Sequence, residues 1–342
     1  MLLQADAVGN LLKCGPRVAL LWLTLIVSPL PADAQVSSQS SQLQRSEGVS
    51  DIWRNATQAQ RFDVASPTLD SPTFLESAGR AWQGVRSGPV KTYGAYLIGA
   101  AVLAAAAFHL IAGPIRLRGA LSGRKIPRFS LPQRTLHWVF ASLFLLLAAT
   151  GLSLLFGRHV LQPLFGDDVF AAMASAALQA HNLFGPLFAF SALALLVLYV
   201  RDNLPARADL TWLRKGALFA RTGLPSWKFN AGEKLWFWIV IVTGFALSVS
   251  GLLLDFSFVA GSTAQIQIAH LVHVAGALIA ITGAIGHIYL GSIGTEGALE
   301  GMVTGEVDAT WAEEHHSLWA AEARKAADLP APPGAPALKP AE

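Results

Sequence analysis

The sequence contains a single cysteine, and this scarcity limits the metal chemistry that the chain can support. This residue is Cys14, in a sequence of 342 residues. It precedes the apolar core of a segment with the features of a secretory signal. A mature chain that begins after the signal has no thiol. This excludes disulfides, iron–sulfur clusters held by thiolates, tetrathiolate zinc sites and covalent haem attachment through a C-x-x-C-H motif. Any metal chemistry must therefore rest on histidine.

Charged residues are also scarce. They make up 14% of the sequence, hydrophobic residues make up 53%, and the mean hydropathy is +0.46. Soluble domains contain about 25% charged residues, so this composition indicates a polytopic membrane protein with polar ends. The sequence has no repeat of fixed period and no glycine-rich loop of the phosphate-binding kind, and we expect no nucleic-acid partner.

The first residues predict a signal peptide over residues 1–34. Lys13 and Arg17 form its basic start, residues 18–27 its apolar core and residues 32–34, Ala-Asp-Ala, its cleavage motif. The mature chain then begins outside the cytoplasm. An uncleaved membrane anchor is the alternative.

A Ser/Gln-rich segment, residues 35–90, follows the signal. It contains turn-forming Ser-Pro pairs and no sustained helical or strand period, so we expect a mostly irregular periplasmic segment. Four aromatic residues are spaced through it, either as contacts for a partner protein or as isolated side chains: Trp53, Phe62, Phe74 and Trp82.

Five apolar segments come next, each close to the length of about 20 residues that a bilayer core demands. They cover approximately residues 93–111, 137–156, 183–200, 235–254 and 266–290. The predicted fold is an all-α membrane protein. It consists of a four-helix transmembrane bundle within residues 116–300 and one extra N-terminal transmembrane helix within residues 91–115. Residues 301–342 are expected to form a C-terminal tail, with a helix-like stretch from Trp311 to Trp319 and a Pro/Ala-rich end from Leu329.

Basic residues are concentrated in alternate loops. The loop after the first span contains Arg116, Arg118, Arg124, Lys125, Arg128 and Arg134, and the loop after the third contains Arg201, Arg207, Arg214, Lys215, Arg221, Lys228 and Lys234. The loop after the second span has only Arg158, and the loop after the fourth has no basic residue. By the positive-inside rule the loops after the first and third spans are cytoplasmic. This predicts a multi-pass protein of the bacterial inner membrane with a periplasmic N-terminus and a cytoplasmic C-terminus.

The last span contains two histidines on one face. His273 and His287 are fourteen residues apart, and fourteen steps of about 100° return to within roughly 40° of the start. Along the helix axis they are about 21 Å apart, so one lies near each membrane surface. This arrangement suits two haems stacked across the membrane, provided that other helices supply a second ligand for each iron.

The predicted depths identify the second ligands. His137 lies at the cytoplasmic start of the second span and His181 at the periplasmic start of the third. Depth therefore pairs His137 with His287 and His181 with His273. Two neutral imidazoles in the axial positions give a haem that transfers electrons and has no open position for a substrate. The alternative for each histidine is a polar side chain that bonds a neighbouring helix or a lipid headgroup.

The remaining histidines are expected to have other roles. His270 faces away from His287 and is interpreted as a residue that packs between helices or supports a ligand histidine without binding the metal. His109 has no partner at its depth and is interpreted as an interfacial or interhelical residue. We expect His159 in the periplasmic loop, and His315 and His316 in the tail, exposed to solvent, although zinc binding in the tail is conceivable.

Two further features allow alternative interpretations. Glycines seven residues apart on the last two spans allow close approach either by a flat macrocycle or by another helix: Gly244, Gly251, Gly276 and Gly283. In KFNAGEKLWFW, before the fourth span, Asn230 and Glu233 match an N-terminal helix cap. Alternatively, Asn230 and the backbone of Gly232 face a ligand beside His287.

Several motifs, in order, resemble the gamma subunit of membrane-bound formate dehydrogenase. They are TLHW, HNLFGP, RDNLP, KFNAGEKLWFW, the H-x13-H span and GMVTGEVDATWAEEHH, and the resemblance covers residues 129–319. It implies a dihaem cytochrome b bundle with the axial ligands His137, His181, His273 and His287. The extra N-terminal residues depart from shorter family members, which begin just before TLHW.

The resemblance also implies a function. A periplasmic molybdenum or tungsten alpha subunit oxidises formate, and an iron–sulfur beta subunit passes the electrons to the periplasmic haem. The cytoplasmic haem then reduces a quinone, and proton uptake inside contributes to a proton-motive force. The quinone is expected beside His287 and Asn230, with Gly232 as a further contact, and the chain itself has no catalytic role toward formate.

Other functions remain open at the level of the sequence. The chain could be the cytochrome b of a hydrogenase or a thiosulfate reductase, a haem-free membrane anchor, or a transporter with a histidine path for zinc. The predicted spans contain no Asp or Glu, which argues against a transporter because transporters usually pair histidine with carboxylates.

Overall fold

The computed structural model describes residues 82, 84–215 and 223–326. The chain divides into two compact units, residues 1–83 and 84–342. The fold below is that of the second unit, because only Trp82 of the first is described. The predicted signal peptide, most of the segment 35–90 and the Pro/Ala-rich end from Leu329 lie outside the described residues.

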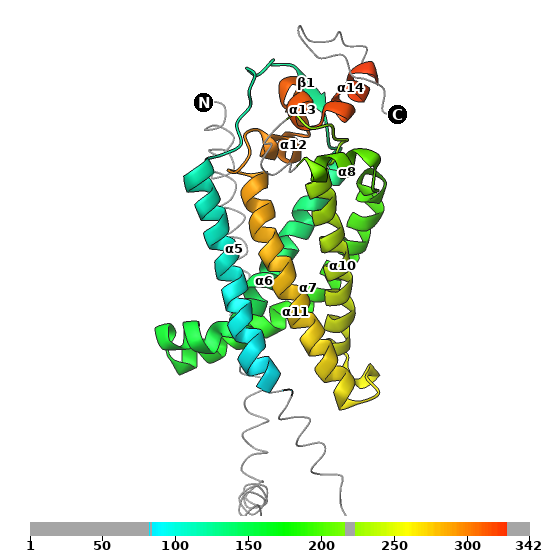
Figure 1. Ribbon diagram of the computed structural model, residues 1–342. Coiled ribbons are helices and arrows are strands. Elements are labelled where there is room, and N and C mark those ends of the chain that lie inside the picture. Colours follow the sequence, from blue (N-terminus) through cyan, green and yellow to red (C-terminus); the bar gives the residue numbers. More distant parts are fainter. Residues whose placement is uncertain (1–81, 83, 216–222, 327–342) are drawn as a thin grey trace, which may run out of the picture. The chain divides into compact units, whose positions relative to one another are not determined.

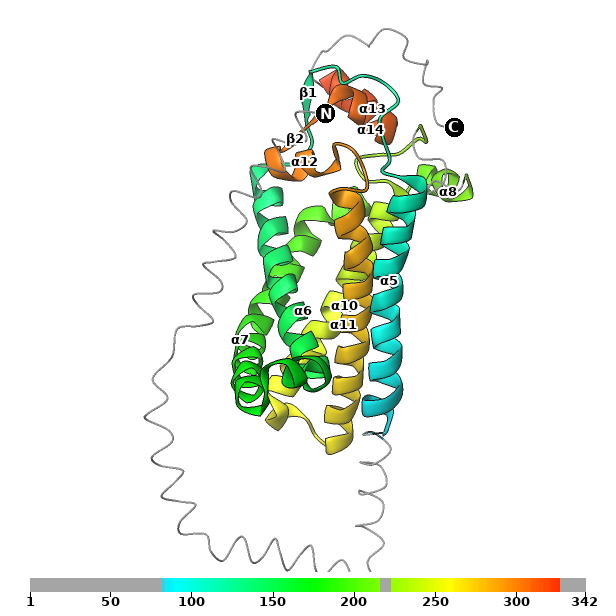
Figure 2. The same ribbon diagram turned by 90° about the vertical axis from the view of Figure 1, so that its left-hand side faces the viewer.

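Five long helices form the body of this unit (Figure 1). They are α5 (Lys91–Ala112, after the short π-helical turn η1, Arg86–Val90), α6 (Leu131–Phe165), α7 (Asp167–Tyr199), α10 (Ala231–Asp255) and α11 (Thr263–Gly291). All five are long and apolar enough to cross a membrane. Helix α6 packs on α7, α7 on α10 and α10 on α11, while α5 lies along α11 (Figure 2). The predicted four-helix bundle with one extra helix is confirmed.

Local capping explains where the bundle helices begin. Ser130 and Gln133 form a capping box at the start of α6, and Asn230 and Glu233 form another at the start of α10. The Ser262 side chain accepts a hydrogen bond from the backbone N–H of Gln265 at the start of α11. Such caps satisfy backbone donors that the first helical turn leaves free.

The junction between α6 and α7 differs from the prediction. A loop was expected between residues 156 and 183, but the two helices continue toward each other and only Gly166, with φ 81°, separates them. His159 therefore lies on α6, not in a loop. Hydropathy marks the part of a helix at the depth of the bilayer core, and polar residues extend the helix beyond it. Asp167 and Asp168, for example, occupy the first turn of α7, where the helix dipole favours negative charge.

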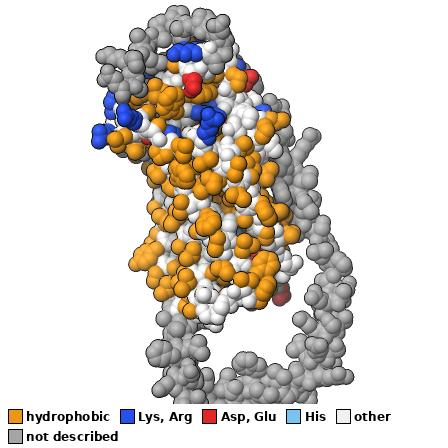
Figure 3. Space-filling view, turned by 90° about the vertical axis from the view of Figure 1, so that its right-hand side faces the viewer, with side chains coloured by type: hydrophobic (Ala, Val, Ile, Leu, Met, Phe, Trp, Pro, Cys, Tyr) orange, Lys and Arg blue, Asp and Glu red, His pale blue; other side chains and the backbone are white. Residues whose placement is uncertain are grey.

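The bundle has an aromatic core and an apolar exterior. The rings of Phe140 and Phe188 stack with centroids 5.0 Å apart between α6 and α7, and Phe237 of α10 belongs to the same cluster. Hydrophobic side chains also cover the outside of the bundle, whereas Lys and Arg side chains gather at one end (Figure 3). An exposed apolar surface of this extent suits contact with lipid acyl chains.

A small polar cap, residues 113–130 and 294–326, covers the end of the bundle where α5 and α11 finish (Figure 1). It contains β1 (Lys125–Pro127), α12 (Ala298–Thr304), β2 (Glu306–Asp308), α13 (Ala309–His315) and α14 (Ser317–Ala326), and the strands pair antiparallel. At the same end lie the short helices η2 (Val200–Asn203) and α8 (Arg207–Arg214). The helix-like stretch predicted around Trp311 is confirmed.

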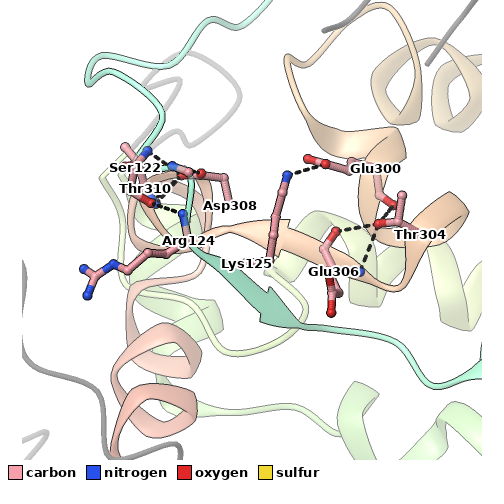
Figure 4. A network of polar contacts seen from close by, with 9 residues as sticks. Ser122, Arg124, Lys125, Glu300, Thr304, Glu306, Asp308 and Thr310 are labelled. Atoms are coloured by element: carbon pink, nitrogen blue, oxygen red, sulfur yellow. Dashed lines mark hydrogen bonds and ion pairs between the residues drawn. The ribbon is translucent and has the colours of Figure 1, made fainter. Parts of the chain in front are cut away.

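Carboxylates of the second cap segment bind the backbone of the first (Figure 4). Asp308 accepts hydrogen bonds from the backbone N–H groups of Ser122 (3.1 Å), Gly123 (2.8 Å) and Thr310 (2.8 Å). Burial alone would raise the pKa of Asp308, but these hydrogen bonds outweigh burial and hold the pKa below its ordinary value. Lys125 also forms an ion pair with Glu300. The chain leaving α5 is therefore fastened to the C-terminal segment.

The expected solvent exposure of the two cap histidines is wrong. His316 is only 1% exposed, and His315 is half-buried. The sequence around them is polar, but Trp311 and Trp319 pack against the His316 ring and exclude water from it.

Candidate functional site

The structure places four histidine rings in two facing pairs. The ring centroids of His137 and His287 are 6.2 Å apart, and those of His181 and His273 are 6.0 Å apart. His137 comes from α6 and His181 from α7, while both partners come from α11. The pairing by membrane depth therefore matches the contacts in the bundle.

This spacing fits one metal ion between each pair of rings. A ring nitrogen binds a metal at about 2 Å and lies roughly 1 Å from its own ring centre, so two imidazoles on opposite sides of an ion have centres about 6 Å apart. Among the described residues no three His, Cys, Asp or Glu side chains gather to hold a metal ion. Ligands in pairs suit an ion whose other four ligands are the nitrogens of a porphyrin.

Hydroxyl groups orient both rings of the pair His181–His273. Thr150 Oγ1 lies 2.8 Å from His181 Nδ1 and donates to the carbonyl of Leu146 at 2.9 Å. Ser250 Oγ lies 3.1 Å from His273 Nδ1 and bonds the backbone of α10 in the same way. Because each hydroxyl proton goes to a carbonyl, the hydroxyl oxygen accepts the Nδ1–H of the histidine. The lone pair is then on Nε2, where a metal can bind.

A glycine follows each of these hydroxyl residues and lies against the same ring. A Cβ atom on Gly151 would be 3.3 Å from His181 Cε1, and one on Gly251 would be 3.1 Å from His273 Cε1. The dipeptides Thr150-Gly151 on α6 and Ser250-Gly251 on α10 are therefore equivalent. Each provides a hydroxyl beside a histidine Nδ1 and a glycine that leaves room for the same ring. Thr150 and Ser250 were not identified from the sequence, where the available signal is a hydroxyl residue followed by glycine within an apolar span.

The other glycines named from the sequence have mixed surroundings. Gly283 allows the close approach of Trp236, whose ring would be 2.3 Å from a Cβ atom at that position. Gly244 and Gly276 lie against the side chains of Ala192 and Leu247, as in ordinary helix packing.

The pair His137–His287 has an aromatic environment. Trp236 of α10 stacks on His287 with centroids 5.4 Å apart and planes at 21°, and Trp138 contacts His137 edge-on. The buried Nδ1 atom of His137 has no hydrogen-bond partner among the described residues. Buried polar atoms nearly always have partners, so the protein alone does not satisfy the polar groups of this pair. Trp236, which lies in the LWFW run, was not identified from the sequence either.

Other predicted residues lie as follows. His109 of α5 is interhelical, as expected, because its Nδ1 is 3.3 Å from the hydroxyl of Tyr289 on α11. His270 is half-buried on α11.

Asn230 caps helix α10, as its spacing to Glu233 predicted. Its Oδ1 accepts the backbone N–H of Glu233 at 3.0 Å, and Glu233 Oε2 accepts the backbone N–H of Asn230 at 2.8 Å. Gly232 faces Trp212 of α8, 3.1 Å from where its Cβ atom would be. No hydrogen bond joins Asn230 or Gly232 to His287 within the described part of the chain; Trp236, farther along α10, contacts His287.

A buried arginine lies beside this helix start and was not identified from the sequence. Arg128 Nη2 contacts the carbonyl of Lys228 (2.9 Å), Glu233 Oε1 (3.3 Å) and His316 Nε2 (3.0 Å). Burial lowers the pKa of the Arg128 guanidinium, an effect that the Glu233 carboxylate opposes. Burial first, and then the charge of Arg128, hold the pKa of His316 well below its ordinary value.

Comparison with known proteins gives a consistent result. Residues 128–305 match the model of the family described as prokaryotic cytochrome b561. A cytochrome b556(fdo) subunit of formate dehydrogenase from Escherichia coli K12 is 30% identical over 206 residues, which cover 58% of this chain and 94% of the relative.

Two further relatives have similar names. The cytochrome b556 subunit of formate dehydrogenase from Haemophilus influenzae is 29% identical over 203 residues, 57% of this chain and 82% of the relative. The cytochrome b556(Fdn) subunit of the nitrate-inducible formate dehydrogenase from Escherichia coli K12 is 27% identical over 212 residues, 59% of this chain and 94% of the relative. The resemblance stated from the motifs is confirmed. Because the family match covers more than half of the chain and includes both histidine pairs, the chain belongs to the prokaryotic cytochrome b561 family of membrane-embedded b-type haem proteins.

Proposed function

We propose that the chain is the membrane cytochrome b subunit of a formate dehydrogenase and that it carries electrons through two b haems to a quinone. The observation that carries the proposal is the spacing of the two histidine pairs, 6.2 and 6.0 Å between ring centroids, which suits two bis-histidine haems. The names of the relatives supply formate as the source of electrons.

His181 and His273 hold one haem, and His137 and His287 hold the other. A haem iron with two imidazole ligands accepts and releases single electrons and has no open position for a substrate. Around the first haem, Thr150 and Ser250 keep the Nε2 lone pairs directed at the iron. Around the second, Trp236 fixes the plane of the His287 ring by stacking on it.

The two haems define a direction across the membrane. The positive-inside rule supports a cytoplasmic position for the polar cap with its basic loops, and His181 and His273 then lie toward the periplasm. An iron–sulfur beta subunit, fed by a molybdenum or tungsten alpha subunit, delivers electrons to that haem. His273 and His287 are about 21 Å apart along α11, so a haem held by His137 and His287 would lie at the cytoplasmic side, where it would supply electrons to a quinone.

Asn230, Gly232 and His287 bind the quinone. Asn230 lies about 9 Å along α10 from Trp236, the residue that stacks on His287. The helix cap occupies Asn230 Oδ1, so the amide N–H groups of Nδ2 are the donors that it can offer to a quinone carbonyl. Proton uptake by the reduced quinone inside, with formate oxidised outside, contributes to the proton-motive force.

Haem analysis of the purified protein tests the proposal. We expect two b haems per chain in a reduced-minus-oxidised visible spectrum. His181→Ala and His273→Ala are each expected to remove one haem, and so are His137→Ala and His287→Ala. A single haem in the unchanged protein, or two haems in any of these variants, contradicts the assignment.

The electron donor requires a separate test, because cytochrome b subunits of hydrogenases and thiosulfate reductases would share the same bundle. Membranes that contain the chain are mixed with formate or hydrogen, and haem reduction is recorded; in a parallel sample with chemically reduced haem, thiosulfate is added and haem reoxidation is recorded. We expect haem reduction by formate. Reduction by hydrogen and not by formate would assign the chain to a hydrogenase instead.

A further inference from the structure

We propose that Arg128 is a positioning residue for the quinone site and that His316 of the polar cap holds it in place. This inference rests on the proposed function, because it concerns the orientation of Asn230 toward a quinone. Neither residue is required to touch the quinone or a haem.

One guanidinium nitrogen holds the helix start on both sides of Asn230. Arg128 Nη2 donates to the carbonyl of Lys228, two residues before Asn230, at 2.9 Å. It also contacts Glu233 Oε1, three residues after Asn230, at 3.3 Å. Movement of residues 228–233 away from this position would break both contacts.

The second carboxylate oxygen of Glu233 bonds Asn230, so that restricting Glu233 also restricts Asn230. It accepts the Asn230 backbone N–H at 2.8 Å, while the Glu233 backbone N–H bonds Asn230 Oδ1 at 3.0 Å. These two bonds fix the backbone and the side-chain oxygen of Asn230. The amide N–H groups are thereby left facing a defined direction, which is what selective hydrogen bonding to a quinone carbonyl requires.

Arg128 is poorly placed for a merely stabilising ion pair. Its side chain is 4% exposed, whereas its carboxylate partner Glu233 is 38% exposed. The rings of Phe129 and Trp311 lie 4.9 and 4.8 Å from its guanidinium carbon. Burying a cation costs free energy that a half-exposed partner offsets only in part. The N–H groups of Nη2, however, point in directions fixed by the guanidinium plane, whereas the ammonium group of a lysine rotates on a flexible stem and would not keep the same acceptors in place.

His316 of the polar cap bonds the Arg128 guanidinium and limits its movement. Its Nδ1 donates to the carbonyl of Trp227 at 2.8 Å, which leaves Nε2 as the acceptor for Arg128 Nη2 at 3.0 Å. His316 lies beyond residue 305, where the family match ends. The polar cap therefore takes part in shaping the proposed quinone site, although it adds no ligand.

Quinol oxidation by the full-length, haem-loaded protein in membranes provides the test. A short-chain quinol reduces the haems, and stopped-flow absorbance gives its half-saturating concentration and the limiting rate. We expect Arg128→Lys to raise the half-saturating concentration about tenfold, because an oriented hydrogen-bond network is lost. Haem content and the limiting rate should stay close to the unchanged protein. Arg116→Lys, on an exposed arginine of the same cap, is the matched control.

A pair of His316 variants separates positioning from simple stability. His316→Gln keeps an acceptor for Arg128 and is expected to retain most of the quinol affinity of the unchanged protein. His316→Leu removes the acceptor and should raise the half-saturating quinol concentration as Arg128→Lys does. Equal effects of the two variants would overturn the role of His316. Loss of haem from both Arg128→Lys and His316→Leu would overturn the proposal, because these residues would then support the bundle and not the helix start.

Asn230→Asp distinguishes failure of this inference from failure of the proposed function. Aspartate caps helices as well as asparagine does but lacks the amide donor, so quinol affinity should fall without unfolding. If Asn230→Asp lowers the affinity and Arg128→Lys does not, the positioning role is wrong and the quinone site stands. If neither changes the affinity, both are wrong. If only Arg128→Lys changes it, the effect does not act through Asn230 and the inference fails.

Discussion

Thr150 and Ser250 distinguish the two histidine pairs at the level of single atoms. Each buried hydroxyl accepts Nδ1–H from one ring of the pair His181–His273, whereas Nδ1 of His137 has no such partner among the described residues. A hydrogen bond at Nδ1 fixes the ring orientation and increases the basicity of Nε2. The two proposed haem sites are therefore expected to respond differently to mutation.

Thr150→Val and Ser250→Ala should each weaken the haem held by His181 and His273 by roughly 10-fold or more, because the ring loses its orienting acceptor. Haem retention after dilution in detergent, followed by absorbance, measures the effect. Thr243→Val is a suitable control, since Thr243 lies on α10 and its hydroxyl bonds, among the described residues, only carbonyls of its own helix. Equal haem loss from this control would remove the special role of the two hydroxyls.

Gly251→Ala should disturb the same haem by a steric route. The added Cβ atom would lie 3.1 Å from His273 Cε1, which forces the ring to shift. The matched substitution Gly244→Ala places its Cβ atom 3.7 Å from the Cβ of Ala192, an ordinary contact, and alanine is favoured over glycine in a helix by about 1 kcal/mol. We expect haem loss for Gly251→Ala and unchanged or higher thermal stability for Gly244→Ala. Similar haem spectra for both variants would contradict the steric argument.

Helix α5 is an element that the family match does not include, yet it is closely fitted to α11. A Cβ atom at Gly94 would be 2.7 Å from Leu278 Cδ1, and the hydroxyl of Tyr289 contacts His109 near the other end of the helix. The extra helix therefore contacts α11 near both of its ends. It is not a loose anchor beside the bundle.

Gly94→Val should separate α5 from α11 and lower the free energy of unfolding by about 1–3 kcal/mol, the usual cost of overpacking. Thermal unfolding of the detergent-solubilised protein gives the measurement. Gly99→Val is the matched control, because a Cβ atom at Gly99 meets nothing within 4 Å. The haem spectrum should be the same in both variants, since α5 contributes none of the paired histidines. A stability loss of equal size in the control would mean that the valine itself, and not the interface, is responsible.

The spans and the histidine pairing could be predicted because each rests on a regular pattern. Hydropathy locates a helix within the bilayer, and depth then matches His137 with His287 without knowledge of side-chain contacts. The α6–α7 junction could not be predicted in this way, because hydropathy does not register a helix that continues into water. The contact between Arg128 and His316 joins residues 188 positions apart, and nothing periodic in the sequence marks it. The same is true of Trp236, one aromatic residue in a run of several.

The polar cap joins the segment after α5 to the end of the described chain and is expected to respond to pH. Burial, followed by the charge of Arg128, lowers the pKa of His315 from 6.5 to about 4, and the pKa of His316 also lies well below 6.5. Between pH 6.5 and about 4 the unfolded cap binds protons that the folded cap does not. The free energy of unfolding of the cap is therefore at its full value above pH 6.5 and falls as the pH decreases through this range.

Hydrogen exchange of the backbone of residues 306–326, corrected for the intrinsic pH dependence, measures this effect. Exchange should become faster as the pH falls below 6.5, and His316→Gln should reduce the change because glutamine does not titrate. Protection that is constant from pH 7 to about 4.5, or an unaltered response in His316→Gln, would argue against histidine titration as the cause.

At the scale of the whole molecule, the proposed direction of electron flow depends on which end faces the cytoplasm. The single cysteine lies in the predicted signal peptide, so introduced cysteines report sidedness. Phe258, 84% exposed between α10 and α11, is replaced by cysteine in one variant, and exposed Arg116 of the polar cap in another. In intact cells a membrane-impermeant thiol reagent should label Phe258→Cys, and should label Arg116→Cys only after permeabilisation. The reverse pattern would invert the proposed path of electrons.

Both histidine pairs take one ring from α11, which follows α5, α6, α7 and α10 along the chain. During synthesis, His137 and His181 enter the membrane first, and neither has its partner until the last span has emerged from the ribosome and inserted. A nascent chain that stops after α10 contains two half-sites and no complete one. On the proposed ligation, haem loading is consequently a late event in biogenesis, because it cannot precede the insertion of α11.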